Sequence, residues 1–272
     1  MQVAATRSLG RRTEAGLAAT RQHLPTRSML EMDAERAITT VAHADIGFAL
    51  GNDTEVAPRE RDEAVSRALN IVLATVALVV LAPVFVLVAI AIRLTSRGPV
   101  LYSQTRVGVD RRWRFARKND RRLYDYGGCL FTMFKFRTMR VDAEPDGRAV
   151  WASKADPRVT MIGRFLRSTR LDEIPQLWNV LRGDMNIVGP RPERPSIFAE
   201  LRRHIPEYQQ RQRVKPGITG WAQVNQSYDA CIDDVRQKVQ LDLEYVRRQG
   251  VMEDLRIMSM TVPVMLFRKG GW

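Results

Sequence analysis

The sequence of 272 residues contains few of the side chains on which metal and thiol chemistry depends. It has two cysteines, Cys129 and Cys231, without a CxxC pair, and three histidines, of which two precede residue 60. This composition predicts neither a zinc site nor a disulfide framework, fits a reducing cytoplasm and argues against histidine-based catalysis. The sequence also lacks GxxxxGK(S/T), a strand-bound GxGxxG and HExxH, so P-loop, dinucleotide-binding and zincin functions have no support.

Negative charge is scarce relative to positive charge. The chain has 43 Lys and Arg against 30 Asp and Glu, which gives a formal net charge of +13. Such an excess favours anionic partners, among them nucleic acid, anionic lipid headgroups and phosphorylated substrates. With 45% apolar residues the chain can still bury a full core. Charge alone does not choose among these partners.

One long uncharged run points to a membrane. The residues from Ile71 to Ile92 include no Asp, Glu, Lys or Arg and are interrupted only by Thr75 and Pro83, which is typical of a membrane segment. Pro83 lies near the centre, where its missing N–H should kink the helix or break it into two short half-helices. Arginines flank both ends, so the positive-inside rule gives no orientation. A re-entrant hairpin and an ordinary kinked spanning helix are equally compatible with these features.

The remainder of the chain predicts a mainly α fold with a few short strands. We divide the sequence into a mostly disordered tail (1–60, with a short helical pattern at 29–42), a membrane segment (61–97) and a domain (98–272). In the domain, periodicity predicts extended segments at 102–107 and 131–139 and helices at 158–168, 175–182, 195–204 and 232–248. A last amphipathic helix at 251–267, interrupted at Pro263, is predicted to pack on the core or to lie in the membrane interface.

A very basic insertion separates the two predicted extended segments. Its cations are Arg111, Arg112, Arg114, Arg117, Lys118, Arg121 and Arg122. A solvated loop is the ordinary interpretation. Contact with anionic headgroups is the alternative, because the insertion follows a membrane segment.

Two adjacent acids, Asp172 and Glu173, precede a short predicted helix. Pro175 suits its first position, and Gly183 follows its end. At a helix N-terminus the dipole and the free N–H groups stabilise an ionised carboxylate and attract phosphate. An ionised carboxylate can attack phosphorus, and a second acid beside it can hold a metal. Ordinary helix capping is the competing interpretation.

Two loops rich in proline and glycine follow this helix. In the first, Pro190 and Pro192 fix the backbone on either side of Arg191, which suits bidentate recognition of a phosphate. A plain connector between helices is the alternative. The second loop, KPGITGW at 215–221, has glycines that would let its backbone approach a ligand closely, and a tight surface turn is the alternative.

One acid, Asp242, falls on an apolar helix face. It belongs to a stripe on the predicted helix 232–248 that also contains Val235, Val239 and Val246. Burying an acid costs several kcal/mol unless a cation or hydrogen bonds compensate it. We expect Arg167 or Lys135 as its partner, either in a structural salt bridge or in an active site.

Several long segments occur in a fixed order between residues 67 and 267. They are LTSRGPV at 94–100, QTRVG at 104–108, FKFRTM at 134–139, LDEIPQLWNVLRGD at 171–184, VGPRP at 188–192 and KPGITGWAQVN at 215–225. With these segments the chain resembles one family, the bacterial sugar transferases that act as monotopic polyprenyl-phosphate hexose-1-phosphate transferases.

The resemblance implies a re-entrant membrane helix bent at Pro83, with the catalytic domain on the cytoplasmic face of the bacterial inner membrane. In the family a serine often precedes that proline, whereas this sequence has Ala82, so the proline would act without a nearby hydroxyl. The implied architecture is a membrane hairpin followed by a small cytoplasmic catalytic domain with amphipathic interfacial helices.

The resemblance also implies roles for individual residues. Asp172 matches the nucleophile and Glu173 its neighbour in an acid pair near a magnesium ion. The other positions that match the family's active site are Lys135, Arg167, Arg191 with its flanking prolines Pro190 and Pro192, and Asp242. Asp172 would attack the sugar-bearing phosphate of a UDP-sugar, and the phosphosugar-aspartate would then pass its sugar phosphate to undecaprenyl phosphate, the first step of exopolysaccharide or other surface-glycan synthesis.

Two functions of other classes compete with this one. A membrane-tethered nucleic-acid-binding protein fits the charge but leaves the acid pair and Arg191 unexplained. An inactive scaffold fits the fold, but the intact Asp172–Glu173 pair argues against it. The transferase interpretation predicts a UDP-sugar, polyprenyl phosphate and a membrane as partners, and no nucleic acid. The sequence does not name the sugar, and it leaves the formation of a homo-oligomer open.

Overall fold

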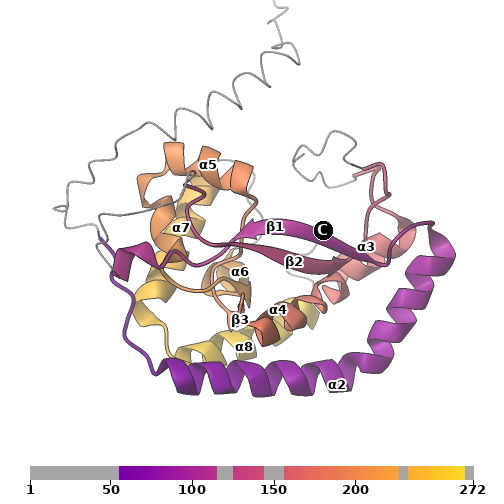
Figure 1. The fold of residues 1–272 in the computed structure, drawn as a ribbon, viewed down its shortest axis with the longest axis horizontal. Helices are drawn as coiled ribbons and strands as arrows, with labels where there is room; N and C mark the ends of the chain where they lie inside the picture. Colours follow the sequence, from indigo (N-terminus) through magenta and orange to yellow (C-terminus); the bar gives the residue numbers. More distant parts are fainter. Residues whose placement is uncertain (1–54, 115–124, 144–155, 227–231, 267–272) are drawn as a thin grey trace, which may run out of the picture. The chain divides into compact units, whose positions relative to one another are not determined.

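The computed structural model describes residues 55–114, 125–143, 156–226 and 232–266, which belong to one compact unit. Helices dominate, as predicted, and the strands are few and short (Figure 1). The elements are α2 (Glu63–Thr95), β1 (Leu101–Val107), the 3₁₀ turn η1 (Arg112–Arg114), β2 (Leu130–Phe136), α3 (Met161–Ser168), η2 (Leu171–Glu173), α4 (Gln176–Arg182), β3 (Asn186–Val188), α5 (Pro195–His204), η3 (Pro206–Arg213), β4 (Gly217–Thr219), α6 (Trp221–Asn225), α7 (Ile232–Arg248) and α8 (Val251–Leu266).

The apolar run forms one long helix, α2, of 33 residues. It begins at Glu63, directly after Asp62, whose carboxylate accepts hydrogen bonds from the N–H groups of Ala64 and Val65, as an N-cap does. The prediction of two separate half-helices is wrong, because the helix continues through Pro83. Figure 1 nevertheless shows α2 as two arms that meet at a bend, and a proline inside a helix accounts for such a bend.

Both ends of α2 are bound to the same domain. Near its beginning, the Arg67 guanidinium donates to the carbonyl oxygens of Val180 and Leu181 at 2.5 and 2.6 Å, where α4 ends. Beyond its end, the Arg137 guanidinium donates to the carbonyl oxygens of Arg97 and Ser96 at 2.8 and 2.9 Å. The bonds to Val180, Leu181 and Ser96 satisfy carbonyl groups that helix ends leave without a partner.

The antiparallel pair β1–β2 carries Lys135. Its register places Leu101 opposite Phe136 and Val107 opposite Leu130. The other edge of β2 is closed by Asn179 of α4, whose Oδ1 accepts from the Phe134 N–H at 3.1 Å and whose Nδ2 donates to the Thr132 carbonyl at 2.7 Å. Asn179 is completely buried. Its side chain binds the free edge of β2 as a neighbouring strand would, and so fixes the position of the strand that contains Lys135.

The two loops rich in proline and glycine pack on each other. Strands β3 and β4 are parallel, with Asn186 opposite Gly217 and Val188 opposite Thr219. A Cβ on Gly189 would lie 2.4 Å from the Lys215 carbonyl oxygen, and a Cβ on Gly217 would lie 2.1 Å from the Gly189 nitrogen. The close approach that the 215–221 glycines allow is therefore made by the backbone of the other loop, and an approach to a ligand stays a prediction.

The helices that cover these strands follow the sequence closely. Helices α5 and α7 have the predicted limits. Helix α3 begins at Met161 instead of 158, because Thr160 caps it by accepting from the Gly163 N–H at 3.0 Å. The predicted stripe of α7 is buried together with residues of α5, η3 and α8 in one hydrophobic core, while α2, β2, α3 and α4 share a second core.

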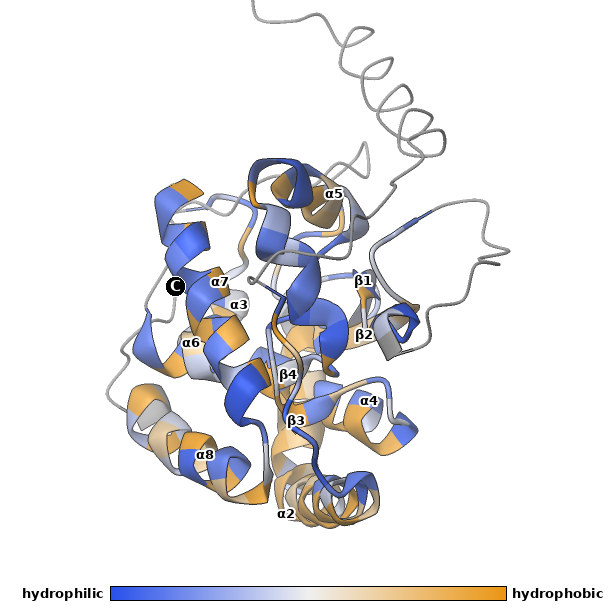
Figure 2. Cartoon of the chain, turned by 90° about the vertical axis from the view of Figure 1, so that its left-hand side faces the viewer, coloured by the Kyte–Doolittle hydropathy of each residue, from blue (hydrophilic) through white to orange (hydrophobic). Residues whose placement is uncertain are grey.

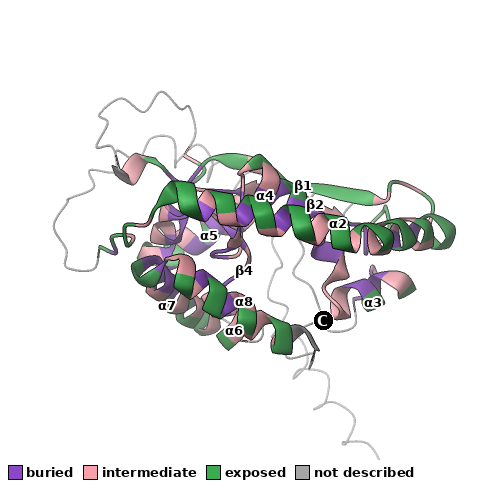
Figure 3. Ribbon diagram, turned by 90° about the horizontal axis from the view of Figure 1, so that it is seen from below, coloured by how far each residue is buried: buried purple, intermediate pink, exposed green. Residues whose placement is uncertain are grey.

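A large part of the apolar surface of α2 is exposed. In its most apolar stretch only 11% of the residues are buried, and the helix is long and apolar enough to cross a membrane. Figure 2 shows hydrophobic residues along α2 and α8 at the lower edge, and Figure 3 shows exposed residues along both helices. Of the two alternatives predicted for the last helix, packing on the core is confirmed, since Ile257 of α8 is completely buried.

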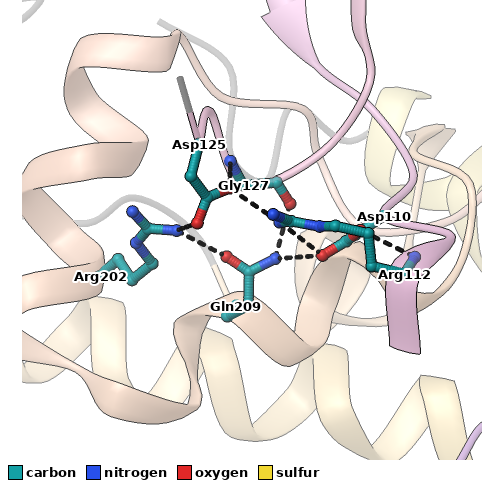
Figure 4. A network of polar contacts seen from close by, with 6 residues as sticks. All are labelled: Asp110, Arg112, Asp125, Gly127, Arg202 and Gln209. Atoms are coloured by element: carbon teal, nitrogen blue, oxygen red, sulfur yellow. Dashed lines mark hydrogen bonds and ion pairs between the residues drawn. The ribbon is translucent and has the colours of Figure 1, made fainter. Parts of the chain in front are cut away.

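A network of hydrogen bonds and ion pairs fixes the two ends of the basic insertion to the domain (Figure 4). Asp110 accepts two bonds from the Arg112 guanidinium, at 2.8 and 2.9 Å, and a third from Gln209 Nε2 at 3.0 Å. Asp125 accepts from Arg112 at 2.8 Å and from Arg202 at 2.9 Å. Arg112 is thus a structural cation instead of a solvated one. Most of the insertion, the 29–42 pattern and the tail up to residue 54 lie outside the described residues, whereas Val56 is buried against the domain.

Candidate active site

A cavity of about 770 Å³ opens beside β1 and β2. Asp172, Lys135, Arg167 and Arg191 all line it, so the structure brings together four residues that lie up to 56 positions apart in the sequence. The remaining charged lining residues are Arg106, Arg137, Arg140, Glu193, Arg194 and Lys238. A cavity with this excess of cations is suited to a ligand that carries several negative charges.

Glu173 does not line this cavity, but it holds two of the cations that do. Its Oε1 accepts from Lys135 Nζ at 2.9 Å and from Arg191 Nη2 at 2.9 Å, and Arg170 Nη1 lies 3.9 Å away. Asp172 is less engaged, because the nearest cation that contacts it, Lys135 Nζ, is 4.0 Å from its Oδ2. The two neighbouring acids therefore differ: Glu173 holds the cations in place, and Asp172 faces the cavity.

The pKa values of the two acids shift in opposite directions, because the cations contact Glu173 more closely than Asp172. Burial raises the pKa of Asp172, and Lys135 opposes this shift only in part. Burial acts on Glu173 too, but Arg191, Lys135 and Arg170 outweigh it and hold the pKa of Glu173 well below its usual range. Burial lowers the pKa of Lys135, although Glu173 opposes that shift. Paired titratable groups with separated pKa values are typical of functional sites.

The acid pair follows a strained turn. Arg170 has φ 58° and ψ 12°, and among the non-glycine residues described it alone has a positive φ. The left-handed conformation is uncommon outside glycine, and strain of this kind clusters at functional sites. The turn ends α3 and starts the 3₁₀ turn η2, which brings Asp172 to the cavity and Glu173 to Lys135 and Arg191, just before α4 and close to the helix start that the sequence predicts.

The loop around Arg191 is held at each carbonyl from Pro190 to Glu193. The Pro190 oxygen accepts from the Gly217 N–H at 3.0 Å, and the Pro192 oxygen accepts from Arg106 Nη1 at 3.1 Å. The Glu193 oxygen accepts from the Val107 N–H at 2.9 Å. The prolines also restrict φ. The loop is therefore a rigid support for Arg191, as predicted, and does more than connect two elements.

Asp242 is buried, as predicted, but its predicted partners are wrong. Neither Arg167 nor Lys135 contacts it; its Oδ2 accepts from Arg211 Nε at 2.7 Å, with 0% of the Arg211 side chain and 2% of the Asp242 side chain exposed. Arg211 Nη2 donates to the Arg191 carbonyl at 3.1 Å, and its guanidinium lies 4.7 Å from the Tyr208 ring centre. Asp242 does not line the cavity. Its link to the site runs through Arg211 to the backbone of Arg191.

Several residues of the site were not predicted from the sequence. Arg106 and Lys238 lie 3.7 Å from the two carboxylate oxygens of Glu193, and all three line the cavity. They come from β1, α7 and the loop between β3 and α5, so no spacing in the sequence connects them. Arg167 lines the cavity too, but its guanidinium makes no ion pair within the described part of the chain. The only local feature that marks the position of the site is the uncommon φ of Arg170, and it is visible in the structure but not in the sequence.

The donor set at the acid pair is compatible with magnesium. Mg²⁺ is commonly bound through one or two carboxylates, with water and substrate phosphates as the remaining ligands. Asp172 and Glu173 provide that minimum, and Asp172 faces the cavity where phosphates would lie. No group of three or more His, Cys, Asp or Glu side chains suited to a metal occurs among the described residues, so a cage made of protein ligands alone is not found there.

Comparison with known proteins agrees with this geometry. The family model described as bacterial sugar transferase matches residues 61–268. The UDP-glucose:undecaprenyl-phosphate glucose-1-phosphate transferase of Escherichia coli (strain K12) is 42% identical over 198 residues, which cover 72% of this chain and 39% of that protein. The undecaprenyl-phosphate glucose phosphotransferase of Komagataeibacter xylinus is 41% identical over 218 residues, which cover 78% of this chain and 38% of that protein.

A third relative is matched over its whole length. The exopolysaccharide production protein PSS of Rhizobium leguminosarum bv. phaseoli is 37% identical over 220 residues, which cover 78% of this chain and 100% of that protein. The chain thus spans less than half of the first two relatives and all of the third. The family match covers most of the chain and every described residue of the cavity. The chain belongs to the bacterial sugar transferase family.

Proposed function

We propose that this chain transfers a sugar 1-phosphate from a UDP-sugar to undecaprenyl phosphate and so initiates the synthesis of a surface glycan. The observation that carries the proposal is the position of Asp172, a buried carboxylate that lines a cavity rich in arginine and lysine. The names of the relatives support these classes of donor and acceptor. Phosphoryl transfer depends mainly on positioning and on neutralising charge, and the cavity is suited to both.

In the first step Asp172 acts as the nucleophile. A carboxylate oxygen forms a bond to the phosphorus that carries the sugar, and the bond from that phosphorus to the bridging oxygen breaks. The electron pair of the broken bond leaves with UMP, and a phosphosugar-aspartate remains. Lys135 and Arg191 face the charge that develops, because Glu173 fixes both at 2.9 Å.

In the second step undecaprenyl phosphate is the nucleophile. One of its phosphate oxygens attacks the same phosphorus, the bond to Asp172 breaks, and the carboxylate is restored. No proton transfer is required in either step, which agrees with a site that contains no histidine among its described lining residues. Arg167, Arg106 and Lys238 line the cavity through which the phosphates would enter and leave.

Magnesium completes this proposal. Asp172 and Glu173 would hold the ion together with phosphate oxygens of the donor, and bound Mg²⁺ supplies charge neutralisation at the phosphates. The residues of the chain keep their own roles. Glu173 orients Lys135 and Arg191, and Arg191 stays in place through the hydrogen bonds of its loop.

We further propose that α2 enters and leaves the membrane on the cytoplasmic face. A straight helix of 33 residues is about 50 Å long, whereas the hydrocarbon core is about 30 Å thick. A spanning helix separates its ends by that thickness, but both ends of α2 are hydrogen-bonded to one domain, through Arg67 and Arg137. The bend at Pro83 and the exposed apolar residues of both arms fit a helix that returns to the face it entered.

Cysteine labelling tests this topology. Glu60→Cys and Arg97→Cys, each in a chain whose Cys129 and Cys231 are replaced by serine, report on the two ends of α2. We expect both positions to resist a membrane-impermeant maleimide in intact spheroplasts and to react in inverted vesicles. Labelling of one position in spheroplasts and the other in inverted vesicles contradicts the re-entrant topology.

Release of UMP tests the reaction. The detergent-purified chain is incubated with magnesium, undecaprenyl phosphate and a panel of UDP-sugars, with Asp172→Asn as the test variant and Asp233→Asn, an exposed acid on α7, as the matched control. We expect UMP from one sugar nucleotide, dependent on the lipid, lost in Asp172→Asn and kept in the control. Absence of UMP with every donor, at the level of Asp172→Asn, contradicts the proposal and favours an inactive scaffold.

A further inference from the structure

A second cavity, of about 370 Å³, lies near the beginning of α2 and shares no lining residue with the candidate active site. We name it the α2 cavity. Its charged and aromatic lining residues are Arg61, Glu63, Arg111, Trp113, Arg213 and Lys215. Its volume falls within the range of about 300–1,000 Å³ that is usual for ligand sites. One acid among four cations leaves a marked positive excess.

Two of these cations have no counter-ion among the described residues. Arg111 and Lys215 make no ion pair within 4.0 Å in the described part of the chain, whereas Arg213 is paired with Glu55 and stacks 5.6 Å from the centre of the Trp113 ring. Burial lowers the pKa of Lys215, and Arg67, Arg111 and Arg61 lower it further by repulsion, which Glu63 only partly offsets. The described lining of the cavity therefore carries an excess of positive charge.

Arg61 provides a second, independent observation. Only 6% of its side chain is exposed, and its Nε and Nη1 atoms are buried without a hydrogen-bond partner. The acids nearest to them, Glu63 and Asp254, lie at 3.8 and 3.7 Å, beyond hydrogen-bonding distance. Buried donors are normally satisfied, so these two donors leave the positive charge of Arg61 incompletely compensated beside the cavity.

We propose that the α2 cavity binds a phosphate group, and that its source in the cell is the headgroup of an anionic membrane lipid. A phosphate carries several acceptor oxygens, which suit a guanidinium and an ammonium group together. The cavity adjoins Glu63, the first residue of the helix whose exposed apolar face begins at Val65. A lipid whose chains lie along that face would bring its headgroup to this level. The inference needs neither a catalytic Asp172 nor a UDP-sugar.

The first experiment measures lipid retention by native mass spectrometry of the detergent-purified full chain. It is titrated with phosphatidylglycerol or phosphatidylcholine, and the test variant is Arg111→Gln with Lys215→Gln. The control, Arg203→Gln with Arg236→Gln, removes the same charge from exposed arginines of α5 and α7 that line neither cavity. We expect the Kd for phosphatidylglycerol to rise at least about tenfold in the test variant, the equivalent of one lost charged hydrogen bond, and to stay unchanged in the control.

The second experiment uses the unsubstituted chain, so it does not depend on how a variant folds. The rate of acylation of Lys215 by an amine-reactive ester is followed by peptide mass spectrometry in the presence of phosphatidylglycerol vesicles, phosphatidylcholine vesicles or inorganic phosphate. Protection by phosphatidylglycerol alone supports the headgroup. Equal protection by inorganic phosphate supports a phosphate site but overturns its assignment to a lipid. No protection by any of the three, or equal loss of retention in test and control variants, overturns the site itself.

Discussion

The buried pair Arg211–Asp242 should govern stability and activity in separable ways. Its two side chains are 0% and 2% exposed, and the Nε–Oδ2 distance is 2.7 Å. Asp242→Leu leaves the Arg211 guanidinium buried without its counter-charge, which typically costs about 3–5 kcal/mol. Since 1 kcal/mol shifts Tm by about 2–4 °C in a chain of this size, we expect Tm to fall by roughly 6–20 °C.

The double variant Asp242→Leu with Arg211→Met should recover most of this loss. Replacing a buried ion pair by apolar residues of similar volume is often neutral or stabilising. The case is favourable here because Arg211 Nη1 already lacks a hydrogen-bond partner, and an unsatisfied buried donor costs about 1–3 kcal/mol. The Arg191 carbonyl nevertheless loses its bond from Arg211 Nη2. We therefore expect stability near that of the wild type, but a rate of UMP release about 10- to 100-fold lower, as for a misplaced positioning group.

The assay combines thermal unfolding in detergent with UMP release for the wild type, the single variant and the double variant. The control is Asp233→Leu with Arg236→Met, an exposed pair on the same helix, which should change stability by no more than about 0.5 kcal/mol. A double variant as unstable as the single one would refute the stability argument. A stable double variant with full activity would refute the positioning role of Arg211.

Four further predictions concern single elements of the site. Asn179→Ala removes the side chain that binds the edge of β2. It should lower the free energy of unfolding by about 1–3 kcal/mol for each buried backbone group left unpaired, and this loss is measured as a lower Tm. Gly189→Ala, whose Cβ would meet the Lys215 carbonyl at 2.4 Å, should lower both Tm and UMP release, while Gly250→Ala, with its nearest contact at 3.8 Å, should not. Lys135→Met should reduce UMP release by about 100- to 1,000-fold, the usual effect of losing one charge-stabilising donor, and retained activity would contradict its role. Chelation of magnesium by EDTA should abolish UMP release, and re-addition of Mg²⁺ should restore it.

The sequence predicts the local elements well where one chain segment suffices. Periodicity locates α5 and α7 to the residue, because the apolar stripe of each helix is complete within its own span. It also locates the acid pair before α4 and the rigid loop around Arg191. The limits of β2 and α3 differ from the prediction because contacts with other segments set them: Arg137 donates its backbone N–H to Val100, and Thr160 to Thr138, at 2.9 and 3.0 Å.

The sequence fails where the structure depends on contacts between distant segments. The partner of Asp242 could not be predicted, because Arg211 lies in a polar 3₁₀ turn with no apolar period. The role of the 215–221 glycines depends on β3, with which β4 pairs. The bend of α2 could be predicted from Pro83, but the continuity of the helix could not, since it depends on how both arms pack against β2, α3 and α4.

The most direct test of the proposed mechanism is detection of the covalent intermediate on Asp172. The purified chain is incubated with magnesium and its UDP-sugar in the absence of undecaprenyl phosphate, quenched, digested and examined by mass spectrometry. The proposal predicts a peptide containing Asp172 with the added mass of the sugar phosphate, which disappears when undecaprenyl phosphate is added and never forms in Asp172→Asn. UMP released in stoichiometric amount without this adduct, or an adduct on another residue, would contradict the assignment of Asp172 as the nucleophile.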